Sequence, residues 1–215
     1  MGAATRFCLV RHGETPWNAE RRIQGQTDIG LSDIGLAQAA LAGRALAGQP
    51  VTALYSSDLT RARSTAERIG ACLGLAPVLA PQFRERRYGI FEGLTYDEAR
   101  AQHPEAYRAF ETRDSAYGVP GGGESLVQMR ARVAPALEAL AQAHPGGLVV
   151  LVTHGGVLDI LNRYLRALPL EAPRDFQIPN AGFNWVRREG DVWVVEAWAC
   201  TEHLQPGSLD ELANA

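Results

Sequence analysis

Residues 147–153 (GLVVLVT) give the strongest strand signal in the sequence, and residues 5–10 have the same apolar, β-branched character. Both runs stop abruptly, residues 5–10 at Arg11 and His12 and residues 147–153 at His154, and glycine follows each histidine. In an open α/β sheet, ligands bind beyond the carboxyl ends of the strands. Polar groups at these two strand ends therefore indicate both a type of fold and the place of a site.

Strands alternate with helices along the first 168 residues. Further strands are expected at 52–56 and 76–79, and helices between 32 and 48 and at 58–73, 95–102, 104–113, 125–144 and 156–168. A hairpin of strands 181–187 and 192–199 follows them. This order predicts a three-layer α/β/α sandwich with a mostly parallel mixed sheet and one antiparallel element.

The length of 215 residues suits one domain, or one domain with a small lid. Residues 83–125 are the only long stretch without a convincing strand, so we expect a single domain over 1–215 with a lid at about 83–125. Pro135 inside a predicted helix is expected to kink it or to remove a hydrogen bond. The small, polar residues 208–215 are expected to fray.

The charge balance limits the possible partners. The 21 basic residues, all of them arginine, face 24 acidic residues, for a net charge of -3. A nucleic-acid surface needs a basic excess, so no nucleic-acid partner is expected and anion binding must be local. No apolar run is long enough to cross a bilayer, and the N-terminus is too short before its first charges for a signal peptide. We expect a cytoplasmic protein without a membrane partner.

The three cysteines, Cys8, Cys72 and Cys200, lie far apart and are odd in number. Cys8 and Cys72 fall within apolar strand and helix patterns and are predicted to be buried free thiols. This favours a reducing compartment over a disulfide scaffold. No pair of cysteines has the spacing of zinc ligands, so no metal site is expected.

If the strands are parallel and adjacent, Arg11, His12, Arg61 and His154 meet at one end of the sheet. Arginine forks match phosphate oxygens, and a helix beginning near 155–156 adds backbone N–H donors. The cluster therefore favours a phosphoryl group as its occupant. The sequence contains no P-loop string, no G-x-S-x-G and no H-E-x-x-H, which disfavours a nucleotide-binding loop, a serine hydrolase and a zinc hydrolase.

Five strings, LVRHGETPWN, YSSDLTRARSTAE, ERRYGIFEG, GGGES and LVTHGG, resemble the histidine phosphatase superfamily, also called the phosphoglycerate mutase-like family. The resemblance covers nearly the whole chain in the right order. It implies that His12 attacks phosphorus and becomes phosphohistidine, that Arg11, Arg61 and His154 form the phosphate pocket, and that Glu85 is the proton donor. It also implies substrate contacts from Asn18, Gln24, Gly25, Arg86, Tyr88 and Gly155.

This chemistry sets requirements for individual groups. The attacking nitrogen of His12 must be unprotonated, and its other nitrogen should donate to a backbone carbonyl. His154 would serve best as an imidazolium, and Glu85 must be protonated when substrate is bound. Gly13 is expected to let the chain turn away without crowding the phosphoryl group. Glu14 and Glu92 are interpreted as structural supports.

We favour a phosphomonoester hydrolase acting on a small phosphorylated metabolite, as a monomer or homodimer and without a cofactor. The stretch RRIQGQTDIGLS resembles the phosphatase branch, and the lid is short and lacks lysine. Arg86 and Tyr88, in contrast, match mutase positions that contact phosphoglycerate. The alternatives are therefore a phosphoglycerate mutase, primed by 2,3-bisphosphoglycerate, and a non-catalytic phosphate-binding or scaffold member.

Overall fold

The two apolar runs are neighbouring parallel strands in the middle of a six-stranded sheet. The computed structural model describes residues 3–204, so the predicted frayed tail at 208–215 lies outside the described residues. The strand order is β3-β2-β4-β1-β5-β6. The strands are β1 (Thr5–Arg11), β2 (Val51–Ser56), β3 (Val78–Leu79), β4 (Leu148–Thr153), β5 (Phe183–Glu189) and β6 (Val192–Cys200).

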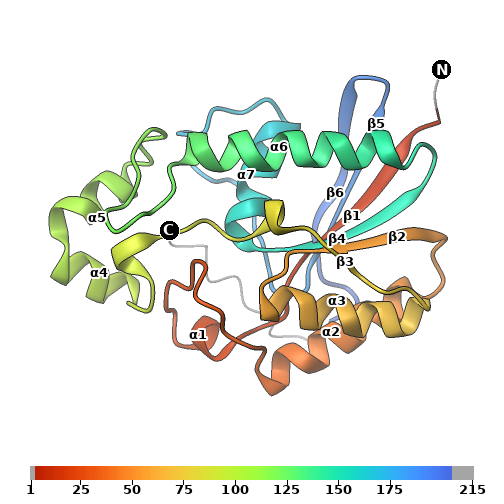
Figure 1. Cartoon of the computed structure of the whole chain (residues 1–215), viewed down its shortest axis with the longest axis horizontal. Helices are drawn as coiled ribbons and strands as arrows, with labels where there is room; N and C mark the ends of the chain where they lie inside the picture. Colours follow the sequence, from red (N-terminus) through yellow and green to blue (C-terminus); the bar gives the residue numbers. More distant parts are fainter. Residues whose placement is uncertain (1–2, 205–215) are drawn as a thin grey trace.

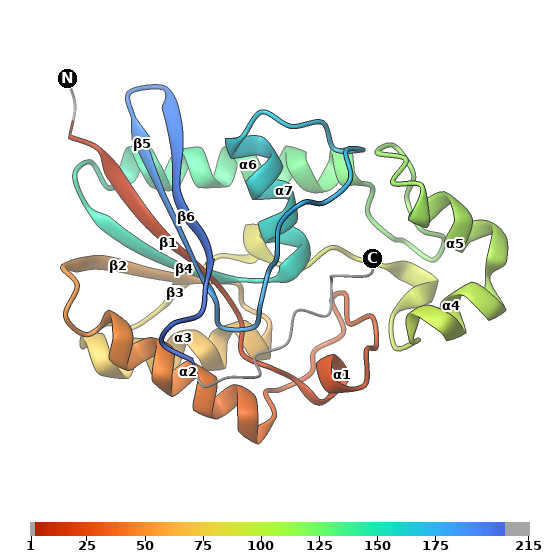
Figure 2. The ribbon, with the colours of Figure 1, turned by 180° about the vertical axis from the view of Figure 1, so that it is seen from behind.

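Helices cover both faces of this sheet (Figures 1 and 2). α2 and α3 lie on one face and α6 and α7 on the other, while α4 and α5 stand apart at one end of the molecule. The helices are α1 (Pro16–Ala19), α2 (Asp33–Leu46), α3 (Thr60–Leu73), α4 (Tyr96–Gln102), α5 (Pro104–Glu111), α6 (Leu126–Ala143) and α7 (Gly155–Leu165), with 3-10 turns η1 (Pro81–Phe83) and η2 (Gly89–Phe91).

The central strand β1 explains the two apolar layers. Successive side chains of a strand point to opposite faces of the sheet. Phe7 and Leu9 belong to the core cluster under α6 and α7, whereas Cys8 and Val10 belong to the cluster under α2 and α3. All four side chains are fully buried. The strand is therefore apolar on both faces because both faces are covered.

The predicted three-layer architecture is confirmed. β3, β2, β4 and β1 pair in parallel, and β5 pairs antiparallel with both β1 and β6, so β5 alone runs against the other strands. α6 continues as one helix through Pro135. α7 ends at Leu165 rather than at 168, since Ala167 has a positive φ of 53° that a right-handed helix cannot contain.

The prediction for Cys72 was wrong, because this cysteine is exposed. It lies in the last turn of α3, beyond Ile69 and Gly70, the last buried positions of that helix. Cys8 is buried as predicted, and burial raises the pKa of its thiol well above the ordinary value. All three cysteines are free thiols.

The region around α4 and α5 has an apolar cluster of its own. Phe91, Ala99, Tyr107 and Val119 are buried there together with Ile23 from the N-terminal part of the chain. α4 begins as the sequence predicts, with Thr95 and Glu98 in a reciprocal capping box. This cluster sits beside the carboxyl ends of the central strands, where it borders the site described next (Figure 1).

Candidate active site

Four of the five predicted catalytic side chains lie together at the carboxyl edge of the sheet. Arg11 ends β1 and is paired with Thr153, which ends β4. His12 and His154 therefore leave neighbouring strands at the same level, and their rings lie edge to face with centroids 5.2 Å apart. Arg61 joins them from the first turn of α3. These four catalytic candidates are no more than 3% exposed.

His12 is held in one tautomer. Its Nδ1 lies 2.7 Å from the carbonyl oxygen of Gly13. A carbonyl can only accept a hydrogen bond, so Nδ1 carries the hydrogen and Nε2 keeps its lone pair. Burial, followed by the charges of Arg61 and Arg11, holds the pKa of His12 well below its ordinary value. His12 is thus a neutral imidazole with a free nucleophilic nitrogen, as its predicted role requires.

Gly13 is glycine for a different reason than expected. A Cβ at this position would lie 2.4 Å from the carbonyl oxygen of Gly35, in the first turn of α2. The missing side chain therefore makes room for the start of α2 rather than for a phosphoryl group. The Gly13 N–H donates to Thr65 in α3 over 3.0 Å, which ties the end of β1 to both helices of this face.

The guanidinium of Arg61 is fixed by carbonyl groups. It donates to the carbonyl oxygens of Gly25 over 2.7 Å and Thr27 over 3.0 Å. Its Nε is buried and has no hydrogen-bond partner within residues 3–204. Burial lowers the pKa of Arg61 to about 10, which leaves it charged at neutral pH. Arg11 is anchored similarly, by a 2.7 Å bond to the carbonyl oxygen of Ile178.

His154 differs from the expected imidazolium. Its Nε2 lies 2.8 Å from the Ser57 hydroxyl, and its Nδ1 is buried without a hydrogen-bond partner in the described chain. Burial, followed by the charge of Arg61, holds the pKa of His154 well below its ordinary value. His154 is therefore neutral in this environment. An uncompensated imidazolium is disfavoured there until an anion arrives to balance it.

Glu85 reaches the same site from the segment after η1 and is only 8% exposed. One carboxylate oxygen accepts the backbone N–H of Arg86 at 2.7 Å and the other accepts that of Gly156 at 2.9 Å. A Cβ on Gly156 would lie 2.3 Å from Oε1 of Glu85. Glycine at the start of α7 thus admits the carboxylate to the helix N-terminus, where the helix dipole favours it.

These groups surround a pocket of about 390 Å³. Four of the predicted catalytic residues and five of the six predicted substrate-binding residues line it, namely Arg11, His12, Arg61 and Glu85 with Asn18, Gln24, Gly25, Tyr88 and Gly155. His154 lies behind this lining, fully buried. Asn18 is also the N3 residue of the capping box that starts α1.

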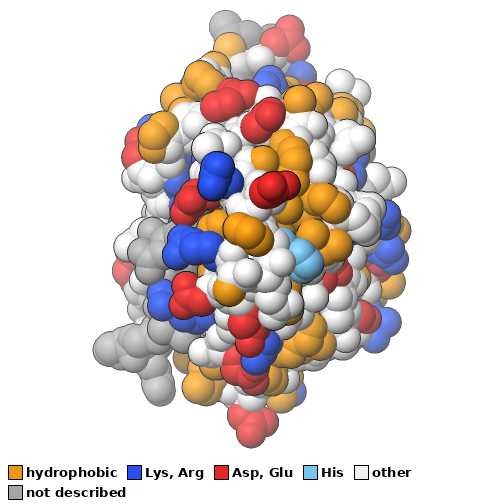
Figure 3. Space-filling view, turned by 90° about the vertical axis from the view of Figure 1, so that its left-hand side faces the viewer, with side chains coloured by type: hydrophobic (Ala, Val, Ile, Leu, Met, Phe, Trp, Pro, Cys, Tyr) orange, Lys and Arg blue, Asp and Glu red, His pale blue; other side chains and the backbone are white. Residues whose placement is uncertain are grey.

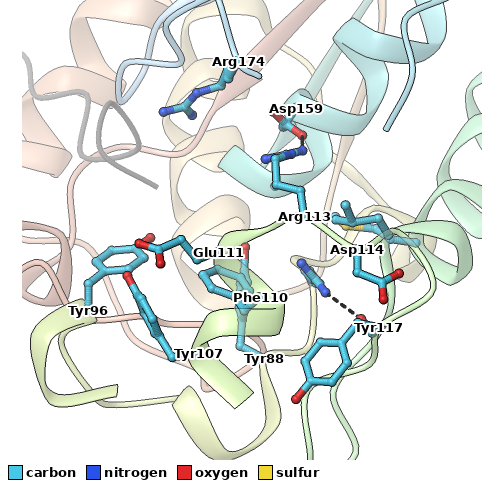
Figure 4. A pocket seen from close by; sticks show the side chains of 14 residues that line it. Tyr88, Tyr96, Tyr107, Phe110, Glu111, Arg113, Asp114, Tyr117, Asp159 and Arg174 are labelled. Carbon is cyan, nitrogen blue, oxygen red and sulfur yellow. Dashed lines mark hydrogen bonds and ion pairs between the residues drawn. The ribbon is translucent and has the colours of Figure 1, made fainter. Parts of the chain in front are cut away.

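A second pocket, of about 820 Å³, adjoins the first between α4–α5 and the sheet domain (Figure 4). Tyr88 and Tyr96 line both pockets, and Gly155 and Gly156 line one each. Five of its 14 lining residues are aromatic, among them Tyr107, Phe110 and Tyr117, and six are charged. Two of the charged residues, Arg113 and Asp159, form an ion pair of 2.8 Å on one side. Glu85 lines the first pocket and accepts a hydrogen bond from Gly156, which lines the second, so its carboxylate lies at the border between the two pockets.

Arg86, the sixth predicted substrate-binding residue, lines the second pocket rather than the first. Its guanidinium donates to the carbonyl oxygens of Glu124 at 2.7 Å and Tyr117 at 3.3 Å. It also lies over the rings of Tyr88 and Phe110, 5.4 Å and 5.7 Å from their centroids. Arg86 thus connects the segment that carries Glu85 to the loop at residues 117–124, in addition to facing the pocket.

Several residues of the site gave no signal in the sequence. The side-chain amide of Asn180 donates to the carbonyl oxygen of His12 over 3.1 Å, and Ser57 contacts His154. Arg132 donates to the carbonyl oxygen of Glu85 over 3.1 Å. Glu92 was interpreted as a structural support, and its carboxylate accepts hydrogen bonds from the backbone N–H groups of residues 26, 27 and 88.

The surface beyond the site is mixed. Seen from the end that carries α4 and α5, acidic, basic and apolar side chains are interspersed (Figure 3). Within residues 3–204, no cluster of three or more His, Cys, Asp or Glu side chains could hold a metal ion. No helix in the same range is long and apolar enough to cross a membrane.

A neutral, buried histidine at a strand end, beside two guanidiniums and a carboxylate, defines an α/β protein built to hold an anion next to a nucleophile. The chain belongs to the histidine phosphatase superfamily (branch 1), whose family model matches residues 7–201. The resemblance seen in the sequence motifs is thereby confirmed over nearly the whole chain.

Two plant relatives are similar over most of their length. The chain is 44% identical over 200 residues to phosphoglycerate mutase-like protein 4 of Arabidopsis thaliana, covering 92% of this chain and 86% of the relative. It is 41% identical over 203 residues to the metal-independent phosphoserine phosphatase of the same organism, covering 93% and 83%. Among solved structures, a mycobacterial glucosyl-3-phosphoglycerate phosphatase in complex with VO3 matches with a TM-score of 0.81 and 33% identity, covering 91% and 99%.

Proposed function

We propose that this protein hydrolyses phosphomonoesters of small metabolites through a phosphohistidine on His12. The observation that carries the proposal is the bond between Nδ1 of His12 and Gly13, which leaves Nε2 free in an anion pocket. The names of two relatives, a phosphoserine phosphatase and a glucosyl-3-phosphoglycerate phosphatase, support hydrolysis of small phosphomonoesters.

In the first step, Nε2 of His12 attacks phosphorus and the bond between phosphorus and the ester oxygen breaks. Arg11 and Arg61 hold the charge on the non-bridging oxygens, with His154 as a further donor. The carboxyl of Glu85 gives its proton to the departing oxygen, since an alkoxide is a poor leaving group. Both Glu85 oxygens accept N–H bonds in the structure, so one of these bonds must weaken when the carboxyl is protonated.

In the second step, water attacks the phosphohistidine and the phosphorus–nitrogen bond breaks. Glu85, now a carboxylate, takes a proton from the attacking water, and inorganic phosphate leaves. The two N–H bonds to its oxygens suit this charged form. The same group thus acts as acid in one step and as base in the other.

We propose that the organic part of the substrate binds in the second pocket. In-line attack puts the leaving oxygen on the side of phosphorus opposite His12, and Glu85 stands at the border with that pocket. We assign residues 83–125 as the lid of a single domain, because α4, α5 and the loop after them supply four of the five aromatic residues that line the second pocket.

The positive charge of the pocket comes from guanidiniums, so we propose that turnover needs no metal and no cofactor. The printed name of the Arabidopsis phosphatase, metal-independent, supports this. The three free thiols support a reducing compartment, and we place the protein in the cytoplasm. Its assembly is proposed to be a monomer or a homodimer.

The proposal is tested by measuring phosphate release from a panel of small phosphomonoesters, with and without 2,3-bisphosphoglycerate and with and without a chelator. Wild type is expected to release phosphate under all these conditions, and His12→Ala is expected to release none. Acid-labile phosphoprotein should be trapped on wild type but not on His12→Ala. Absence of hydrolysis of every ester would contradict the proposal.

A mutase is the second candidate, because one relative is named phosphoglycerate mutase-like protein 4. A mutase returns the phosphoryl group to a second hydroxyl of the bound intermediate instead of to water. Interconversion of 2- and 3-phosphoglycerate that depends on 2,3-bisphosphoglycerate, without phosphate release, would favour it over hydrolysis. Phosphate binding without turnover in either assay would favour the non-catalytic alternative.

A further inference from the structure

The position of the Glu85 carboxyl depends on the main chain that carries it. Within residues 3–204, its two oxygens bond only to backbone N–H groups, one of them from the next residue, Arg86, and the other from Gly156 in α7. Residues 82–87, here called the donor segment, contain no α-helix or strand apart from the end of η1. Whatever holds the donor segment against α7 therefore sets the distance from the acid to the leaving oxygen.

Arg132, in the second turn of α6, makes this attachment. Its guanidinium donates to two carbonyl oxygens of the donor segment, Gln82 at 2.8 Å and Glu85 at 3.1 Å. The carboxylate of Glu124 binds the same guanidinium from the other side, with Nε and one terminal nitrogen at 2.7 Å and 2.8 Å. This two-pronged geometry fixes the guanidinium plane as well as its position.

Glu124 completes the attachment with its own backbone. Its N–H donates to the carbonyl oxygen of Arg87 over 2.8 Å, and its carbonyl accepts Nε of Arg86 at 2.7 Å. The pair Arg132–Glu124 therefore contacts the donor segment on both sides of Glu85. The two side chains are only 24% and 15% exposed, so solvent competes weakly for these bonds.

We propose that Arg132, oriented by Glu124, is a positioning residue for proton transfer by Glu85. It acts by fixing the main chain at Glu85 and makes no contact with the phosphoryl group. The proposal rests on the proposed function, in which Glu85 gives its proton to the ester oxygen as the electron pair of the phosphorus–oxygen bond moves to that oxygen. Without Arg132 the donor segment can shift, and the proton arrives late in that step.

The experiment compares two esters that need this proton to different degrees. The leaving group of p-nitrophenyl phosphate is stable as an anion near neutral pH, whereas that of propyl phosphate requires protonation. We measure kcat/KM for both with wild type and Arg132→Met, since kcat/KM covers the steps up to phosphohistidine. The loss for propyl phosphate is expected to exceed the loss for p-nitrophenyl phosphate by at least about tenfold.

Glu85→Gln serves as the reference, because it should show the same selectivity for leaving group to a larger extent. Arg84→Met is the matched control. Arg84 precedes Glu85 and forms a similar two-pronged pair with Asp58, but no bond links it to the carbonyl of Glu85. The Arg84→Met variant is expected to change kcat/KM for the two esters by equal factors.

Equal losses for the two esters in Arg132→Met would overturn the proposal, and so would a selective loss of the same size in Arg84→Met. If Arg132→Met does not fold, Arg132→Lys keeps the charge but loses the two-pronged bond, and the same selectivity is expected of it. If wild type hydrolyses neither ester, the proposed function itself fails. If wild type is active but Arg132→Met loses activity equally on both esters, only the proposal for Arg132 fails.

Discussion

The chemistry of this site is set by the backbone around each side chain. Gly13 gives His12 its tautomer, Gly25 and Thr27 hold Arg61, and Gly156 holds Glu85. Carbonyl and N–H groups cannot titrate, so they keep each side chain in one orientation over a wide range of pH. Side-chain identity supplies reactivity here, and the main chain supplies geometry.

Gly156→Ala should separate activity from stability. The new Cβ would lie 2.3 Å from Oε1 of Glu85, the far end of a flexible side chain, which can move away. Alanine is also the better helix former, so the melting temperature should hardly change. We expect kcat/KM for an alkyl phosphate to fall on the order of 100-fold, as for loss of a general acid.

Gly48→Ala is the control for this substitution, because nothing lies within 4 Å of a Cβ there. Its kinetics should match wild type. Wild-type kcat/KM in Gly156→Ala would show that the contact of Glu85 with the start of α7 is dispensable. The measurement is steady-state phosphate release together with thermal unfolding of each variant.

At the scale of elements, one strand–helix junction is completed from elsewhere in the chain. α3 begins at Thr60, and its N-cap residue, Leu59, has no side-chain cap bond. Asp28 supplies the cap instead, accepting the backbone N–H of Thr60 at 2.7 Å and its hydroxyl at 2.8 Å. Because Arg61 follows at once, the same cap orients the first turn that carries the guanidinium predicted to bind phosphate.

Asp28→Ala is expected to cost about 1 kcal/mol of unfolding free energy, the usual value of an N-cap. For a chain of this length that lowers the melting temperature by roughly 2–4 °C. Inorganic phosphate should also bind more weakly, as measured by calorimetry. The exposed Asp191→Ala in the β5–β6 turn should change neither quantity, and an unchanged melting temperature in Asp28→Ala would contradict the role of the cap.

The elements that were predictable have local causes. The rule that ligands bind beyond the carboxyl ends of parallel strands predicted that His12, Arg61 and His154 lie together. The capping-box spacing of Thr95 and Glu98 predicted the start of α4. Contacts between distant residues were not predictable, because nothing local marks them. Asn180 meets the carbonyl of His12 across 168 residues, and Asp28 caps a helix 32 residues away.

The predicted proton donor, Glu85, illustrates the same limit. Glu85 was assigned from a motif, but Arg132 was not, although both belong to one hydrogen-bonded unit. In the sequence, Arg132 looks like an ordinary charged residue on the polar face of a helix. Only the fold brings it into contact with the donor segment. The 3-10 turns η1 and η2 were missed as well, since a few residues without periodicity carry no helix signal.

Across the whole molecule, the two buried histidines couple stability to pH. His12 and His154 have folded-state pKa values well below the ordinary value of about 6.5. Below about pH 6.5 the unfolded chain therefore binds protons that the folded chain refuses, so stability falls as the pH falls. Above about pH 6.5 both states are neutral at these positions and the contribution is fully present.

The melting temperature of wild type is thus expected to drop between pH 7.5 and pH 5, measured by thermal unfolding at constant ionic strength. A His12→Asn/His154→Asn double variant should drop less over the same range, because its asparagines do not titrate. Identical slopes in wild type and the double variant would contradict the assignment of neutral histidines.

The strand order has a consequence for synthesis of the chain. β1 is the first of the six strands to be made, yet its neighbours are β4 and β5. One of its edges therefore stays uncovered until β4 is made, at about residue 153, and the other until β5 is made, at about residue 189. Pairing over such sequence distances is slow, and an uncovered apolar strand invites pairing with other chains. A nascent or C-terminally truncated chain ending before β5 would therefore expose the strand that leads to the nucleophile, and would aggregate rather than fold into a weaker enzyme.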